Sequence, residues 1–125
     1  MTQVMAIAIG GAVGAVMRWL MASAVQRHMA GSAFPWGTFC VNALGSFLLG
    51  FLFVWFIERS SSGEVMRMAL TVGFLGAFTT FSTYSLESIR LLEEGAFALA
   101  FGNVMGQVVV GLTLAWLGMS IARSL

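Results

Sequence analysis

Four long apolar segments separated by short polar connections determine what this chain can fold into. They span residues 4–25, 36–57, 65–92 and 97–122. A helix rises about 1.5 Å per residue, so each segment can cross a hydrocarbon core about 30 Å thick. With 59% hydrophobic and 9% charged residues, the chain also lacks the polar surface of a small soluble protein. The sequence predicts an all-α membrane protein, a single four-helix transmembrane domain over residues 1–125.

The basic residues, all arginine, give almost no preferred orientation in the membrane. If the four spans alternate, the two sides carry Arg59, Arg67 and Arg123 against Arg27, Arg90 and, if it snorkels, Arg18. Under the positive-inside rule, three against two or three leaves both orientations open. A chain that inserts both ways can pair with an inverted copy of itself, so we expect an antiparallel, dual-topology homodimer. Orientation in one sense by the insertion machinery is the alternative, and a net charge of +1 predicts no nucleic-acid partner.

Small residues and caps mark helix contacts and helix ends. Gly10 with Gly14 in the first span, and Gly102 with Gly106 in the fourth, are small-xxx-small pairs that predict close backbone contact. Pro35 fits the first turn of the second helix. A capping box, Ser61 with Glu64, is expected to open the third.

Two polar stripes lie at membrane depth, where a polar side chain without a partner costs several kcal/mol. Their members are Thr38, Asn42, Gly45 and Ser46 in the second segment, and Asn103, Gln107 and Gly111 in the fourth. An isolated asparagine in a membrane helix is typical of interhelical hydrogen bonding. Two amide stripes in so small a protein favour a lined polar path instead.

Fixed charge is scarce at membrane depth, and this bears on the competing functions. Only Arg18, Glu87 and Arg90 approach the membrane. A small dual-topology multidrug or cation exporter is the main alternative, and it requires a carboxylate in the first helix, where "AIAIGGAVGAVMRW" has none. His28 has no neighbours spaced for a metal site or a triad, so no enzymatic activity is expected. A structural membrane adaptor would need neither the amide stripes nor a broken helix.

The third segment contains "GFLGAFTTFSTYS", residues 73–85, which predicts a broken helix. Gly73, Gly76, Thr79 and Thr80 are poor helix formers. Non-helical backbone at this depth must be buried in protein or face a cavity. A break exposes carbonyl oxygens, and those of two inverted chains would form a cation site on the dimer axis.

Two aromatic rings follow the predicted break on one face of the resumed helix. Phe81 and Tyr84 are three residues apart. Aromatic rings carry a positive edge, so rings presented edge-on can attract an anion that has lost its water. Ordinary aromatic packing in an apolar bundle is the alternative for rings that stand alone.

Motifs in all four segments resemble the Fluc or CrcB family of small bacterial fluoride channels. They are "GGAVGAVMRW" at 10–19, "GTFCVNALGSFLLG" at 37–50, "GFLGAFTTFSTYSLE" at 73–87 and "GNV" at 102–104. The resemblance implies an antiparallel dimer in the bacterial inner membrane, with two pores and a structural Na⁺ ion at the interface. It also implies fluoride-selective, passive efflux.

By position, the resemblance implies roles for individual residues. The implied fluoride pore comprises Asn42 as amide donor, Phe81 and Tyr84 as paired rings, Thr38, Ser82, Thr83 and Glu87 as lining and vestibule, and Asn103 and Gln107 on the fourth helix. The implied Na⁺ ligands are the backbone carbonyls of Gly76 and Thr79, and Arg18 is either a pore-mouth attractor or a structural anchor. The family motif usually ends TTFSTF, whereas this chain has tyrosine at 84, whose hydroxyl needs a partner.

Overall fold

A computed structural model describes residues 1–59 and 63–125. Within this part of the chain, four helical spans are long and apolar enough to cross a membrane, which confirms the predicted all-α, four-span fold. The elements are α1 (Thr2–His28), α2 (Trp36–Val54), its continuation η1 (Trp55–Arg59), then α3 (Glu64–Met68), η2 (Ala69–Leu75), α4 (Gly76–Phe78) and α5 (Phe81–Glu93) in the third span, and α6 (Phe97–Ser124). The segments η1 and η2 are π-helical.

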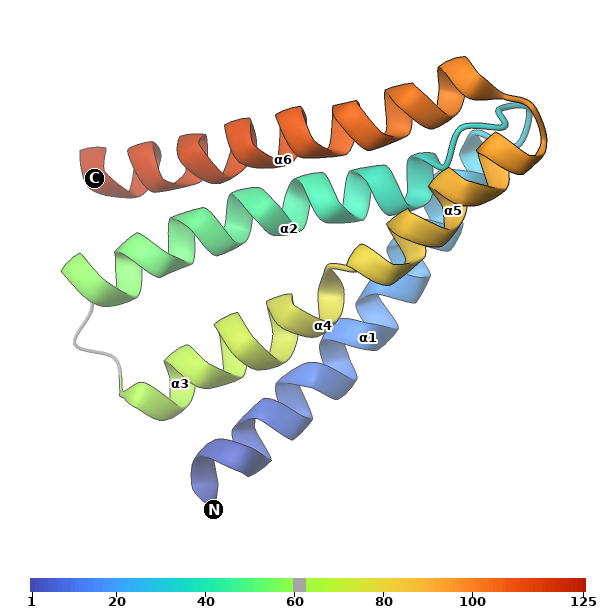
Figure 1. Cartoon of the computed structure of the whole chain (residues 1–125). Helices are drawn as coiled ribbons and strands as arrows, with labels where there is room; N and C mark the ends of the chain where they lie inside the picture. The colour runs from blue at the N-terminus through green and yellow to red at the C-terminus, as the bar shows by residue number, and fades with distance from the viewer. Residues whose placement is uncertain (60–62) are drawn as a thin grey trace.

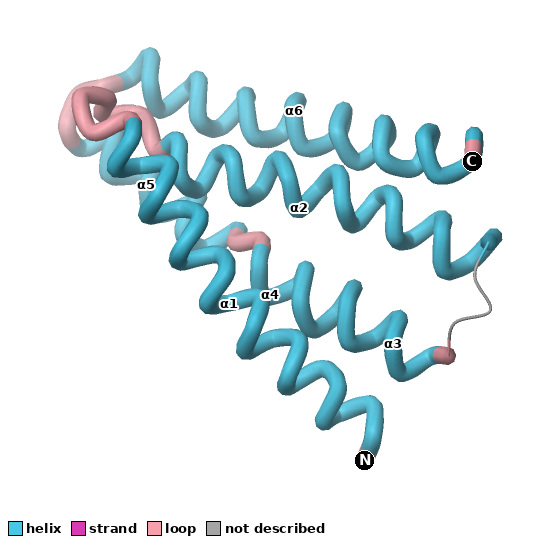
Figure 2. Tube along the Cα trace, turned by 180° about the vertical axis from the view of Figure 1, so that it is seen from behind, coloured by secondary structure: helices cyan, strands magenta, loops and turns pink. Residues whose placement is uncertain are grey.

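The spans form two pairs that diverge toward one end of the molecule (Figure 1). α6 lies along α2, while α1 lies along η2 and α4. Seen from behind, α5 turns away from the direction of α4 and approaches the start of α6 (Figure 2). Both termini lie at the same end as the start of α3, as an even number of alternating spans requires (Figure 1).

The helix starts follow local hydrogen bonding. Pro35 is the N-cap residue of α2, one position before the first turn expected for it. The Gly37 N–H in this turn donates to the Gln26 side-chain oxygen at 3.1 Å, so α1 supplies an acceptor that the α2 backbone cannot provide. The third span begins after its N-cap residue Gly63. The expected capping residue Ser61 lies outside the described residues.

Close contact between α1 and the third span rests on glycine, as predicted for the first small-xxx-small pair. A Cβ atom added at Gly10 would clash with the Ala69 carbonyl oxygen, and one at Gly14 with the Phe74 carbonyl oxygen. Gly73 also leaves no room from the other side, since its Cβ would lie 2.7 Å from the Ile7 carbonyl oxygen. These backbones approach too closely for any side chain between them.

Within the single chain, the second predicted pair does not mediate backbone contact. A Cβ atom added at Gly102 would lie 3.9 Å from the Phe34 ring, and one added at Gly106 would lie 3.1 Å from the Phe39 ring. The close contact between α2 and α6 occurs two turns or more farther along, where Cβ atoms at Gly50 and Gly118 would clash with carbonyl oxygens of the opposite helix. Gly50 follows Ser46, and Gly118 precedes Ala122, at the same four-residue spacing, so spacing alone does not tell which small-residue pairs meet backbone.

We predict that Gly14→Ala destabilises the protein although alanine favours a helix by about 1 kcal/mol. The added methyl must displace backbone, and such overpacking costs roughly 1–3 kcal/mol. Thermal unfolding in detergent micelles measures the change. Gly31→Ala is the control, because nothing lies within 4 Å of a Cβ there. Equal midpoints for Gly14→Ala and the wild type would contradict this account of the α1 contact.

Candidate functional site

The third span breaks at Thr79 and Thr80. Thr79 has φ −82° and ψ 158°, and Thr80 has φ −150° and ψ 120°, so both are extended between α4 and α5. The Thr80 hydroxyl then caps α5 by accepting the Thr83 N–H at 3.3 Å. The break was predicted in this motif, but Gly73 and Gly76 are helical. Gly73 instead allows close packing against α1.

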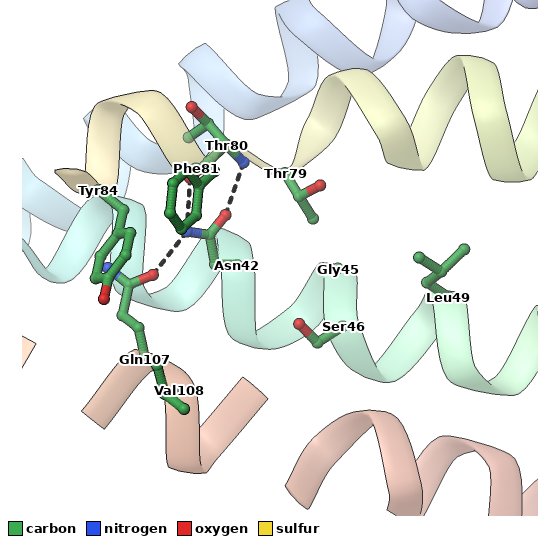
Figure 3. Close-up of a pocket in the computed structure, with 10 residues that line it drawn as sticks. All are labelled: Asn42, Gly45, Ser46, Leu49, Thr79, Thr80, Phe81, Tyr84, Gln107 and Val108. Carbon is green, nitrogen blue, oxygen red and sulfur yellow. Dashed lines mark hydrogen bonds between the residues drawn. The ribbon is translucent and has the colours of Figure 1, made fainter. Parts of the chain in front are cut away.

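Asn42 holds the broken segment through a two-way pairing with the backbone of one residue, Thr80. Its Nδ2 donates to the Thr80 carbonyl at 3.0 Å, and the Thr80 N–H donates to its Oδ1 at 2.8 Å (Figure 3). This pairing fixes the orientation of the amide, because only one assignment gives a donor opposite each acceptor. Thr80 is buried, so without Asn42 its backbone groups would lack partners.

The same pairing frees a backbone oxygen. In a continuous helix the Thr80 N–H would donate to the Gly76 carbonyl, and here it donates to Asn42 instead. The Thr79 carbonyl accepts a bond from Arg18 Nη1 at 3.5 Å, the outer limit for such a bond. Because the Arg18 bond is long and the Gly76 carbonyl has lost its helical donor, both neutral oxygens can still serve as ligands for a hard cation, so the implied pair Gly76 and Thr79 fits Na⁺ chemically.

A chain of amides and hydroxyls connects α2, α6 and α5. Asn42 Nδ2 also donates to Gln107 Oε1 at 2.6 Å, and Gln107 Nε2 donates to Asn103 Oδ1 at 3.0 Å. Asn103 Nδ2 donates in turn to the Ser88 hydroxyl at 2.9 Å, which donates to the Tyr84 carbonyl. The two polar stripes predicted from the sequence therefore meet across the α2–α6 contact. Ser88 was not predicted, although its position one turn after Tyr84 was the available signal.

A cavity of about 280 Å³ lies beside the break. Its lining, drawn in Figure 3, is Asn42, Gly45, Ser46, Leu49, Thr79, Thr80, Phe81, Tyr84, Gln107 and Val108. None of these residues carries a charge. The structure thus brings the predicted amide, both predicted rings and the Gln107 amide to one place.

The two rings are close and tilted. Phe81 and Tyr84 have ring centroids 5.5 Å apart and an interplanar angle of 57°, and Phe81 is 79% exposed in the single chain. The Tyr84 hydroxyl donates to the Val104 carbonyl at 3.2 Å. The polar group that distinguishes this chain from the usual motif therefore has a partner on α6, and the ring keeps its place beside Phe81.

A second cavity of about 410 Å³ lies toward the connection between α1 and α2, and Thr38, Thr83 and Glu87 contribute to it. The Thr38 hydroxyl donates to Glu87 Oε1 at 2.7 Å. Glu87 Oε2 is buried without a hydrogen-bond partner among the described residues. Ser82 is exposed and lines neither cavity, and Asn103 is fully buried behind Gln107.

Fold and site together define a small helical membrane protein with a broken span and an uncharged polar cavity beside the break. The family model described as CrcB-like protein, Camphor Resistance (CrcB), matches residues 5–119. The chain belongs to this family. It is a multi-pass protein of the bacterial inner membrane.

Relatives with similar sequences bear one name, "Fluoride-specific ion channel FluC". The chain is 46% identical to the Geobacter sulfurreducens protein over all of both chains. It is 45% identical to the Magnetococcus marinus protein, over 97% of this chain and 98% of that one. It is 46% identical to the Novosphingobium aromaticivorans protein over 98% of each.

We predict that Asn42→Ala destabilises the fold by roughly 1–3 kcal/mol, because the buried N–H and carbonyl of Thr80 both lose their partner. Thermal unfolding in detergent measures the loss. Ser46→Ala is the matched control, since Ser46 lies one turn along the same helix and lines the same cavity. If the two variants lose equal stability, Asn42 does not hold the break.

Proposed function

We propose that this protein is a fluoride-selective channel that allows passive fluoride efflux as an antiparallel homodimer with two pores. The supporting observation is the cavity at the break, where the Asn42 amide and two aromatic rings meet without a fixed charge. The name shared by its relatives supports the choice of ion. A passive pore requires no catalytic group.

The mechanism replaces the water around a small, strongly hydrated anion with weaker donors from the protein. Asn42 Nδ2 offers an N–H, and the edges of Phe81 and Tyr84 offer positive partial charge. No cation lines this cavity, so the anion is held by dipoles alone and can leave again. Ion selectivity then follows from how well these groups fit the smallest halide.

Access to this cavity involves the remaining predicted pore residues. Thr38 and Thr83 supply hydroxyls in the second cavity. Glu87, which accepts a hydrogen bond from Thr38, lines the same cavity as the vestibule residue. Ser82 is exposed on the same turn as Phe81 and offers a hydroxyl to a path completed by a partner. Asn103 acts from behind, since it is buried and orients Gln107.

The homodimer is supported by the faces that one chain leaves uncovered. In the 18-residue apolar windows of α1 and of α6, only 6% of the residues are buried. Phe81 is 79% exposed although it belongs to the proposed pore, and a pore ring must be enclosed by protein. A second, inverted copy of this four-helix domain would cover these residues, and the nearly balanced arginines permit that orientation.

A structural Na⁺ ion at the dimer interface completes the proposal. The Gly76 carbonyl, freed by the Asn42 pairing, and the Thr79 carbonyl are the ligands that each chain would supply. When bound, such an ion adds positive potential near the pores and fixes the broken spans. Arg18 bonds the Thr79 carbonyl, which favours the anchoring role over the pore-mouth role for this residue.

We predict that purified protein in liposomes releases fluoride far faster than chloride, and that Phe81→Ile abolishes fluoride release by removing the ring edge. A fluoride electrode measures the efflux. The matched control is Phe97→Ile, another exposed phenylalanine that lies outside the cavity. Tyr84→Phe should retain efflux, because the ring remains. Equal fluoride and chloride permeability would reject the function.

We also predict dual topology. A tag fused at the C-terminus should be modified by an impermeant reagent from both sides of the membrane in comparable amounts, because the arginine counts give no preferred orientation. Labelling of intact cells, compared with inverted vesicles, measures this. Labelling from one side alone would eliminate the antiparallel dimer while leaving the ion preference to the efflux assay.

A further inference from the structure

Both amide hydrogens of Asn42 are in use, and the two bonds differ in kind. One Nδ2 hydrogen belongs to the two-way pairing with the backbone of the buried residue Thr80. The other is donated to Gln107 Oε1 at 2.6 Å. An anion that binds to Asn42 must therefore take the place of one of these two acceptors.

The Thr80 acceptor is not replaceable. Its carbonyl is fixed by the backbone of the break, and an anion that took the Nδ2 hydrogen in its place would leave a buried carbonyl without this partner. Gln107 Oε1 is at the end of a flexible side chain that lines the same cavity as Phe81 and Tyr84. Only this oxygen can withdraw without breaking the fold.

Gln107 is also held in the orientation that presents its oxygen to Asn42. Its Nε2 donates to Asn103 Oδ1 at 3.0 Å, and Asn103 is fully buried and donates to Ser88. Since the Gln107 nitrogen is committed to Asn103, the oxygen is directed at Asn42. The orientation is set by a buried donor chain and does not depend on the ion.

We propose that the Gln107 carbonyl oxygen is a built-in substitute for the permeating anion. It accepts the second Asn42 N–H whenever no ion is present, and fluoride displaces it on entry. This inference rests on the proposed channel function and deepens it. Because the anion must replace an existing hydrogen bond, its net affinity is lowered and its release is eased. Gln107 is thus a specificity-determining residue for ion transit, although it offers the ion no donor in this orientation.

The test compares two substitutions that change the acceptor in opposite directions. Gln107→Met keeps length and flexibility but has no carbonyl, so fluoride meets an unpaired Asn42 donor. We expect the half-saturating fluoride concentration for efflux to fall about tenfold, as the loss of one competing hydrogen bond implies, and the maximal rate to fall as release slows. Gln107→Glu places a stronger, negatively charged acceptor there, and the half-saturating concentration should rise.

Opposite shifts of the half-saturating fluoride concentration in the two variants separate this role from a merely structural one. A structural role would lower the efflux rate in both variants without lowering the half-saturating concentration in either. Val109→Met is the control for adding methionine to α6, because Val109 is exposed and lines neither cavity. Size-exclusion chromatography checks that each variant has the wild-type assembly. If Gln107→Met does not fold, Gln107→Glu decides, and an unchanged or lower half-saturating concentration overturns the inference.

The outcomes also separate this inference from the channel function. If the wild-type protein conducts fluoride, but Gln107→Met has an unchanged or raised half-saturating fluoride concentration, only the proposed role of Gln107 is overturned. Wild-type protein that shows no fluoride efflux overturns both.

Discussion

The pairing between the Asn42 side chain and the Thr80 backbone is the interaction on which the rest of the site depends. A helix that breaks inside a membrane leaves peptide groups without partners, and lipid supplies none. One side chain on α2 satisfies the N–H and the carbonyl of the residue at the break. The extended segment can then persist, and α5 starts in a new direction that carries Phe81 and Tyr84 to the cavity.

The close contacts of α1 with the third span and of α2 with α6 hold the Asn42 hydrogen bonds in place. α1 meets the third span at glycine, and α2 meets α6 at glycine, so backbone lies against backbone in both pairs. Contacts of this kind permit little sliding, because carbonyl oxygens occupy the space that side chains would need. Asn42 and Gln107, which face each other across the α2–α6 contact, are therefore held at hydrogen-bonding distance by packing that lies turns away.

The sequence predicts the features that hydropathy and local residue chemistry determine. It does not predict contacts between residues that are distant in the chain. Hydropathy located the spans, and the threonines located the break. The glycines at 73 and 76 were read as helix breakers, yet Gly73 is a packing position, which only the contact with Ile7 reveals. The amide stripes were visible as spacing, whereas the order of donors from Asn42 through Gln107 to Asn103 required the fold. Gly50 and Gly118 were missed for the same reason.

The Asn42 side chain pairs with the backbone of Thr80, and this determines which residues can replace Thr80. The pairing itself does not involve the Thr80 side chain, so a residue that adopts an extended backbone and fits the buried position can satisfy it. Proline does not, because it has no N–H to give to the Asn42 oxygen. The threonine hydroxyl serves a separate purpose at the start of α5. Position 80 therefore has two requirements. The Asn42 pairing excludes proline, and the cap of α5 favours a small side chain that can accept a hydrogen bond.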